Sequence, residues 1–101
     1  MKNNNISKIF DLKNKTIILT GSAGRLGSRF AHVLSNAQAN VILVDIEQTK
    51  NKQLEKKINS IYNTNSLSVN TDITKEDQVK KLIDIVIKKY KKIDGLINNA
   101  H

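Results

Sequence analysis

The feature that most constrains the fold is a glycine-rich segment between a strand-like run and a helix-like pattern. The run Thr16–Thr20 is apolar and β-branched, and Gly21, Gly24 and Gly27 follow it directly. An amphipathic pattern with helical spacing begins at Leu26. Glycines at the start of a helix let a phosphate approach backbone N–H groups, whose partial positive charge attracts it. The order of strand, tight turn and helix therefore predicts a phosphate-binding loop; an ordinary turn is the alternative.

Strand-like and helix-like patterns alternate along the rest of the chain. Three further runs have strand character, namely Val41–Asp45, Ser66–Asn70 and Gly95–Asn99. The segments between the strands carry apolar residues at the spacing of one buried helix face. This alternation predicts an α/β fold: a Rossmann-type parallel sheet with the order β-α-β-α-β-α-β and the strand order 3-2-1-4. We expect residues 1–14 to form a tail that leads into the first strand.

An acidic residue ends the second predicted strand. Asp45 lies about 20 residues beyond the glycines, a spacing typical of the acid that binds the ribose hydroxyls of a dinucleotide. Its carboxylate can accept both hydroxyl protons and would repel a 2′-phosphate, so it favours NAD over NADP. The next residue, Ile46, adds no positive charge, but Arg25 in the loop could reach a phosphate and keeps NADP open. The alternative for Asp45 is a solvated strand end.

A second acid follows the third predicted strand. Asp72 could reach an adenine amino group, and Ile73 could lie against the ring. On residue chemistry alone, an Asx turn or a helix cap is an equal alternative. Thr74 and Asp77 have the spacing of a capping box, which predicts the start of the third helix.

Two amides close the fourth predicted strand. Asn98 and Asn99 can tie neighbouring strands together through backbone hydrogen bonds, and Ala100 leaves room for a ligand. An ordinary polar loop is the alternative. Ser22 lies in the glycine loop without a His–Asp pair to activate it, so we interpret its hydroxyl as a hydrogen-bond donor to phosphate.

Composition argues against several other classes of function. The formal net charge is +8, yet all but two of the 17 basic residues are lysines, spread over helix faces, and two Phe and two Tyr are available for stacking on bases. We therefore do not expect nucleic acid as the main partner. There is no cysteine, and no His, Asp or Glu group has metal-ligand spacing, so we expect no metal. Without a signal peptide or a membrane-spanning run, we expect a cytoplasmic protein that does not contact membranes.

Together these motifs resemble the short-chain dehydrogenase/reductase family, from about Phe10 to the end of the chain. The segment Thr20–Gly27 resembles the cofactor loop of that family, and Asp45 resembles its NAD-selecting acid. The resemblance extends to the family's adenine-contacting pair and to its Asn-Asn-Ala-Gly motif. It implies a dinucleotide site, for NAD in preference to NADP, formed by Gly21, Ser22, Ala23, Gly24, Arg25, Leu26, Gly27, Asp45, Ile46, Asp72, Ile73, Asn99 and Ala100.

The chain departs from the family pattern at two positions. The usual loop is Thr-Gly-x-x-x-Gly-x-Gly, but here the middle glycine comes one place early, at Gly24. That form is commoner in the extended branch, which includes sugar-nucleotide epimerases and remains an alternative. We give more weight to the Asn-Asn-Ala segment of the shorter branch, within which the chain is similar to flagellin or polysaccharide modification oxidoreductases. The second departure is His101, where glycine is usual.

The resemblance also concerns the catalytic residues. Members of this family transfer hydride between NAD(P) and an alcohol or carbonyl with a Ser and a Tyr-x-x-x-Lys pair, all beyond the fourth strand. Here Tyr62 is followed four residues later by Ser66, and Tyr90 by Asp94. We therefore expect residues 15–101 to be an incomplete, NAD-binding half-domain without catalytic residues and inactive alone. Oligomers are then expected only of a longer form, and a non-catalytic NAD-binding module is the alternative.

Overall fold

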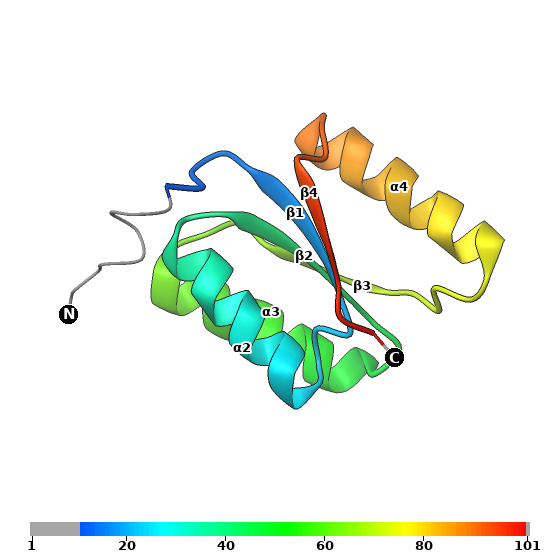
Figure 1. Cartoon of the computed structure of the whole chain (residues 1–101), viewed down its shortest axis with the longest axis horizontal. Coiled ribbons are helices and arrows are strands. Elements are labelled where there is room, and N and C mark those ends of the chain that lie inside the picture. Colours follow the sequence, from blue (N-terminus) through cyan, green and yellow to red (C-terminus); the bar gives the residue numbers. More distant parts are fainter. Residues whose placement is uncertain (1–10, 101) are drawn as a thin grey trace.

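A computed structural model describes residues 11–100 as one parallel sheet flanked by helices (Figure 1). The chain runs through β1 (Thr16–Thr20), α2 (Arg25–Asn36), β2 (Asn40–Asp45), α3 (Gln48–Tyr62), β3 (Leu67–Asn70), α4 (Glu76–Tyr90) and β4 (Gly95–Asn98). Neighbouring strands pair in parallel in the order β3-β2-β1-β4. The predicted α/β fold and strand order are confirmed. Most of the predicted tail, and His101, lie outside the described residues.

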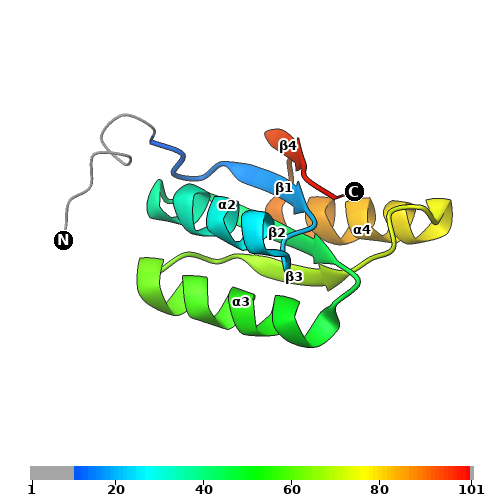
Figure 2. The same cartoon turned by 60° about the horizontal axis from the view of Figure 1, so that its bottom comes forward.

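The helices cover both faces of the sheet, with α2 and α3 on one side and α4 on the other (Figures 1 and 2). Successive residues of β2 alternate between the two layers, because side chains of a strand point to opposite faces. Val41 and Leu43 pack into the core beneath α2 and α3, whereas Ile42 and Val44 pack with Leu82 of α4. These four apolar side chains of β2 are almost fully buried. This burial on both faces explains why the strand is a continuous apolar run.

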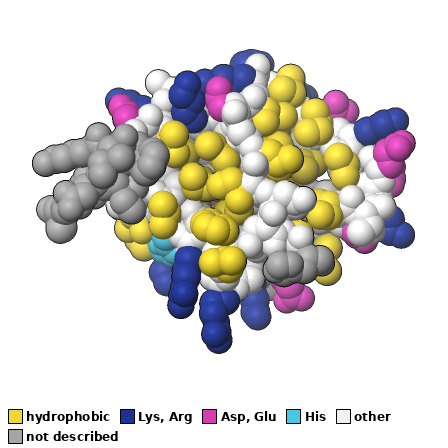
Figure 3. Space-filling model, viewed as in Figure 1, with side chains coloured by type: hydrophobic (Ala, Val, Ile, Leu, Met, Phe, Trp, Pro, Cys, Tyr) yellow, Lys and Arg dark blue, Asp and Glu magenta, His cyan; other side chains and the backbone are white. Residues whose placement is uncertain are grey.

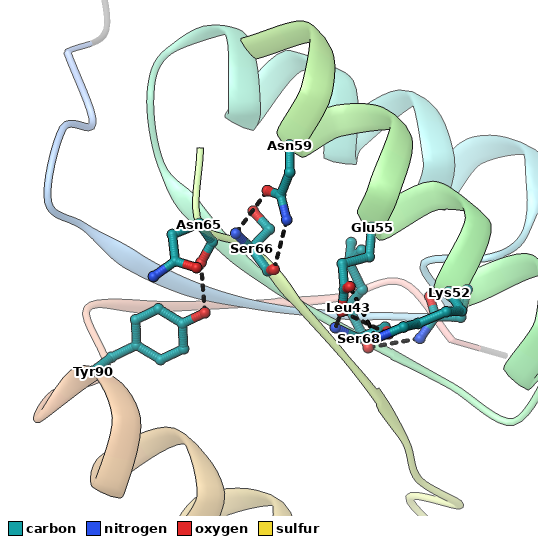
Figure 4. A network of polar contacts seen from close by, with 9 residues as sticks. Leu43, Lys52, Glu55, Asn59, Asn65, Ser66, Ser68 and Tyr90 are labelled. Carbon is teal, nitrogen blue, oxygen red and sulfur yellow. Dashed lines mark hydrogen bonds and ion pairs between the residues drawn. The ribbon is translucent and has the colours of Figure 1, made fainter. Parts of the chain in front are cut away.

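The edge strand β3 is fixed to α3 by polar side chains (Figure 4). Asn59 accepts a hydrogen bond from the Ser66 N–H at 2.8 Å and donates one to the Ser66 carbonyl at 2.9 Å. One carboxylate oxygen of Glu55 accepts from both the N–H and the hydroxyl of Ser68, at 2.7 and 2.9 Å. Lys52 pairs with the other Glu55 oxygen at 3.0 Å. These contacts hold β3 in register at the edge of the sheet, where its side chains are only partly buried or exposed.

The start of α4 differs from the expectation. Its N-cap residue is Lys75, and no side chain caps the helix. The predicted capping box of Thr74 and Asp77 is therefore wrong. The Thr74 hydroxyl instead donates to Asp72 Oδ1 at 2.6 Å, because a short local turn competes with the cap for the same side chain.

The outer side of β4 is exposed and apolar. Leu96 is 64% exposed, and Ile93 nearby is also exposed. Hydrophobic side chains form broad areas on the face of the molecule shown in Figure 3. Within residues 11–100, β4 pairs with β1 alone. In that same range, no helix is both long enough and apolar enough to cross a membrane.

Candidate functional site

A cleft of about 690 Å³ lies where the loops leave the carboxyl ends of the strands. Ten of the thirteen residues predicted for a cofactor site line it, namely Gly21, Ala23, Gly24, Leu26, Asp45, Ile46, Asp72, Ile73, Asn99 and Ala100. The sheet therefore gathers segments from four separate parts of the sequence at one edge. Such an edge, at the switch point of a parallel sheet, is where ligands of α/β proteins bind.

The three loop glycines meet different requirements. Gly21 has a φ of +68°, and a side chain there would crowd the Ala100 backbone at 3.1 Å. A Cβ on Gly27 would lie 2.0 Å from the Gly21 carbonyl oxygen, so only glycine lets α2 start so close to the turn. A Cβ on Gly24 would meet no atom closer than 3.5 Å. The protein itself thus leaves free space beside Gly24, which lines the cleft.

Gly24 is also the N-cap residue of α2, and no side chain caps this helix. The N–H groups of a first helical turn have no partner within the helix. Together with the space at Gly24, they form a place where a phosphate can approach the backbone.

Two buried polar side chains anchor the loop from below. The Ser22 hydroxyl donates to Asn51 Oδ1 at 2.6 Å, and the Asn51 amide donates to the Leu43 carbonyl at 2.7 Å. Ser22 and Asn51 are 0% and 1% exposed. The prediction that the Ser22 hydroxyl donates to phosphate is therefore wrong, because this hydroxyl is turned into the protein and used in a structural bond. Asn51 was missed because a polar residue in the first turn of a helix carries no local signal of a buried partner.

The position of the Arg25 side chain also differs from the expectation. Arg25 is exposed and does not line the cleft. The structure therefore does not bring its guanidinium together with the other predicted residues. Gly27, the third predicted residue outside the lining, acts through its close contact with Gly21.

Asp45 lies at the end of β2 and lines the cleft beside the glycine loop. One carboxylate oxygen accepts a hydrogen bond from the Ala23 N–H and the other from the Glu47 N–H, each at 2.9 Å. Each oxygen of a carboxylate can accept more than one hydrogen bond, so both retain capacity for hydroxyl donors.

The end of β4 is tied to β1 by a threonine. Thr20 Oγ1 donates to Asn98 Oδ1 at 3.0 Å and accepts from the N–H groups of Asn99 and Ala100 at 3.0 and 3.2 Å. The Asn99 side-chain amide donates to the Gly21 carbonyl at 3.2 Å. The expected bond from an amide to the backbone next to the neighbouring strand is confirmed for Asn99, whereas Asn98 is bound through the Thr20 hydroxyl. The sequence analysis placed Thr20 at the end of the first strand and the start of the cofactor loop and gave its hydroxyl no role, although a hydroxyl ending an apolar strand was a usable signal.

Asp72 forms the Asx turn that was one of its alternatives. Its Oδ1 accepts from the Thr74 hydroxyl and from the Thr74 N–H, at 2.6 and 3.0 Å. These two hydrogen bonds, with the nearby charge of Lys75, lower the pKa of Asp72 below its usual value. An ionised carboxylate therefore lines the cleft next to Ile73.

Five lining residues were not among the predictions: Val44, Glu47, Lys50, Thr71 and Thr74. Val44 and Thr71 lie at or just beyond strand ends, so the predicted strands already implied that they face this edge. Glu47 and Lys50 come from the start of α3, and charged residues there are indistinguishable in sequence from a solvated helix face. Among residues 11–100, no group of His, Cys, Asp and Glu side chains could hold a metal ion.

Known proteins resemble this chain in sequence. A sequence profile described as "short chain dehydrogenase" matches residues 15–101. The short chain dehydrogenase/reductase dpfgG of Gibberella zeae is 37% identical over 88% of this chain and 32% of its own length. Post-translational flagellin modification protein A of Campylobacter coli is 30% identical over 89% of this chain and 35% of its own.

Two solved structures have the same fold as this chain. A protein from Haemophilus influenza named as a D-mannonate oxidoreductase, with bound NAD, has a TM-score of 0.88 at 29% identity, covering 95% of this chain and 34% of that one. L-sorbose reductase from Gluconobacter frateurii, complexed with NADPH, has a TM-score of 0.85 at 21% identity over 91% of this chain and 36% of that one, and so shares the fold.

This chain spans about a third of the length of each of these proteins. The matched region carries the fold and the cleft described above. Because the profile covers nearly all of the described residues, the chain belongs to the short-chain dehydrogenase family.

Proposed function

We propose that residues 15–101 form the NAD-binding part of an oxidoreductase that transfers hydride between NAD and an alcohol or carbonyl carbon. The observation that carries this proposal is the position of Asp45, which joins the glycine loop in one cleft from the end of the neighbouring strand. An acid at this place is the group that recognises the ribose hydroxyls in dinucleotide sites. The family to which the chain belongs supports the same reading.

The cleft fits the parts of the cofactor. The free space beside Gly24 and the first turn of α2 would hold the pyrophosphate. Asp45 would hold the adenosine ribose. Two exposed apolar side chains, Ile46 and Ile73, line the cleft next to the acids and would contact the adenine. Asn99 and Ala100 would border the nicotinamide half.

When bound, the nicotinamide supplies the carbon that gives or takes the hydride. The residues of this chain bind and orient the cofactor. In this family, a Ser and a Tyr-x-x-x-Lys pair carry out the acid–base chemistry. This sequence contains no Tyr-x-x-x-Lys pair. The substrate pocket is likewise assigned to the part of the relatives that this chain does not match.

Asp45 makes NAD the preferred cofactor. A 2′-phosphate at the ribose site would face this carboxylate and repel it. Arg25 lies outside the cleft lining, and the basic residue within it, Lys50, is accompanied there by the acidic residue Glu47. Binding of NADH and NADPH to the 101-residue chain, followed by isothermal titration calorimetry, tests the proposal. We expect NADH to bind at least about tenfold more tightly than NADPH, a difference of about 1.4 kcal/mol. Failure to bind either dinucleotide would contradict the function itself.

A module that binds NAD without catalysis would use the same cleft and is the second candidate. The intact mass of the protein made from its native gene separates the two. A mass near 11.4 kDa would favour the module. A mass several times closer to that of the relatives would favour the oxidoreductase.

A further inference from the structure

The Asp45 carboxylate connects two segments that are distant in the sequence. Ala23, whose N–H it accepts, lies in the middle of the glycine loop, 22 residues before it. Glu47, the other donor, is the N-cap residue of α3. A single side chain at the end of β2 thus links the loop after β1 with the turn that starts α3.

The loop's other hydrogen bonds to distant parts of the chain hold its first two residues, while the Gly24 N–H donates within the loop to the Gly21 carbonyl at 3.2 Å. The N–H groups of Gly21 and Ser22 donate to the Val44 carbonyl at 2.8 and 3.3 Å. The Ser22 hydroxyl is bound to Asn51. Within residues 11–100, the hydrogen bond to Asp45 is the one that the Ala23 N–H makes. The next residue, Gly24, caps α2 and borders the free space of the cleft.

We propose that Asp45 is also a positioning residue for the pyrophosphate end of the site. This inference rests on the proposed function. By charge alone, a carboxylate next to a phosphate loop weakens anion binding. By fixing Ala23, however, Asp45 holds the loop so that the first N–H groups of α2 are in place before the ligand arrives. Ordering a loop ahead of binding reduces the entropy lost on association. For a ligand that has no ribose, the charge of Asp45 weakens binding, whereas its ordering of the loop strengthens binding.

Inorganic pyrophosphate is the probe that separates the two effects, because it carries the anion and no ribose. The variant Asp45→Asn keeps the size of the side chain. The Ala23 and Glu47 N–H groups bind different oxygens of Asp45, so the amide of the variant turns its NH₂ donor toward one of them. Glu47→Gln is the matched control, since it removes one negative charge from the same cleft and leaves the Glu47 backbone N–H intact. Pyrophosphate is titrated into the 101-residue chain and followed by amide chemical shifts.

We expect Asp45→Asn to bind pyrophosphate roughly three- to tenfold more weakly than the wild type, the effect of one lost hydrogen bond on loop order. Glu47→Gln should bind it as tightly as the wild type or more tightly. Pyrophosphate binding by Asp45→Asn that equals or exceeds that of the wild type would overturn the proposal. If Asp45→Asn does not fold, Asp45→Glu, which keeps the charge and displaces the carboxylate, is expected to show the same loss.

Amide hydrogen exchange gives a second readout that needs no ligand. The Ala23 N–H should exchange faster in Asp45→Asn than in the wild type and in Glu47→Gln, whereas the Gly21 N–H, bound to Val44, should not change. Exchange at Ala23 that is unchanged in both Asp45→Asn and Asp45→Glu would overturn the positioning role. A wild-type chain that binds neither pyrophosphate nor NADH would contradict the proposed function, and the exchange of Ala23 would still decide the role of Asp45.

Discussion

Gly27 lies so close to Gly21 that a Cβ on Gly27 would come within 2.0 Å of the Gly21 carbonyl oxygen. The contact closes the loop between β1 and α2 from the inside. Gly24, between them, has no such neighbour in the protein. The same motif therefore contains glycines required by the fold and one that is left for a ligand.

Alanine substitutions should separate these requirements. Gly27→Ala forces the backbone of the loop apart, and we expect it to reduce the free energy of unfolding by about 2–4 kcal/mol. Gly24→Ala should change the free energy of unfolding by less than about 1 kcal/mol, because its φ of −75° suits alanine. It should nevertheless weaken NADH binding at least about tenfold. Urea unfolding and calorimetric titration measure the two effects. Wild-type NADH affinity in Gly24→Ala would show that the pyrophosphate does not lie there.

The buried pair of Ser22 and Asn51 makes a second prediction. Asn51→Ala leaves both the Ser22 hydroxyl and the Leu43 carbonyl without their partner, and we expect a loss of about 2–3 kcal/mol in the free energy of unfolding. Ser22→Ala should cost about 1 kcal/mol, and the double variant less than the sum. The exposed neighbour Gln53→Ala is the control and should stay within about 0.5 kcal/mol. Additive losses in the double variant would contradict the bond.

The sequence predicted the strands, their order and most of the cleft because these depend on local patterns. Strands buried on both faces are apolar runs, and the parallel topology then brings their ends to one edge. Side-chain direction depends instead on distant partners. The Ser22 hydroxyl could turn to a ligand or to the core, and the buried Asn51 amide, which decides between them, is 29 residues away. For Thr74 the difficulty is different, because capping α4 and bonding Asp72 are both local options and the sequence does not rank them.

Glu55 should make the stability of the chain depend on acid pH. Burial raises its pKa, but hydrogen bonds from Ser68 and the Lys52 ammonium outweigh burial, so the net pKa lies below the usual value (Figure 4). A folded-state pKa that is lowered stabilises the protein above the unfolded pKa, and this contribution is lost as the pH falls through the folded pKa. We expect the free energy of unfolding to fall less steeply below about pH 4.5 in Glu55→Gln than in the wild type. Parallel pH profiles in urea would contradict this.

The open edge of β4 predicts self-association of the 101-residue chain. Leu96 is 64% exposed on a strand whose outer backbone groups have no neighbouring strand among residues 11–100. Such edges pair with other chains, and lysine on an edge opposes this. Sedimentation of a concentration series should show larger species for the wild type than for Leu96→Lys. Ile61→Lys, on an exposed position of α3, is the control and should associate like the wild type.

Both ends of the β1–β4 pair are joined by side chains that lie far apart along the chain. The Asp94 carboxylate accepts from the Thr16 N–H, and Thr20 donates to Asn98, each across 78 residues. At a synthesis rate of about 5–20 residues per second, β4 is therefore made roughly 4–16 s after β1. The pairing of β1 with β2, which begins at Asn40, can form much earlier. The nascent chain should thus acquire its sheet from one side first, with the other edge of β1 open to chaperones until β4 leaves the ribosome.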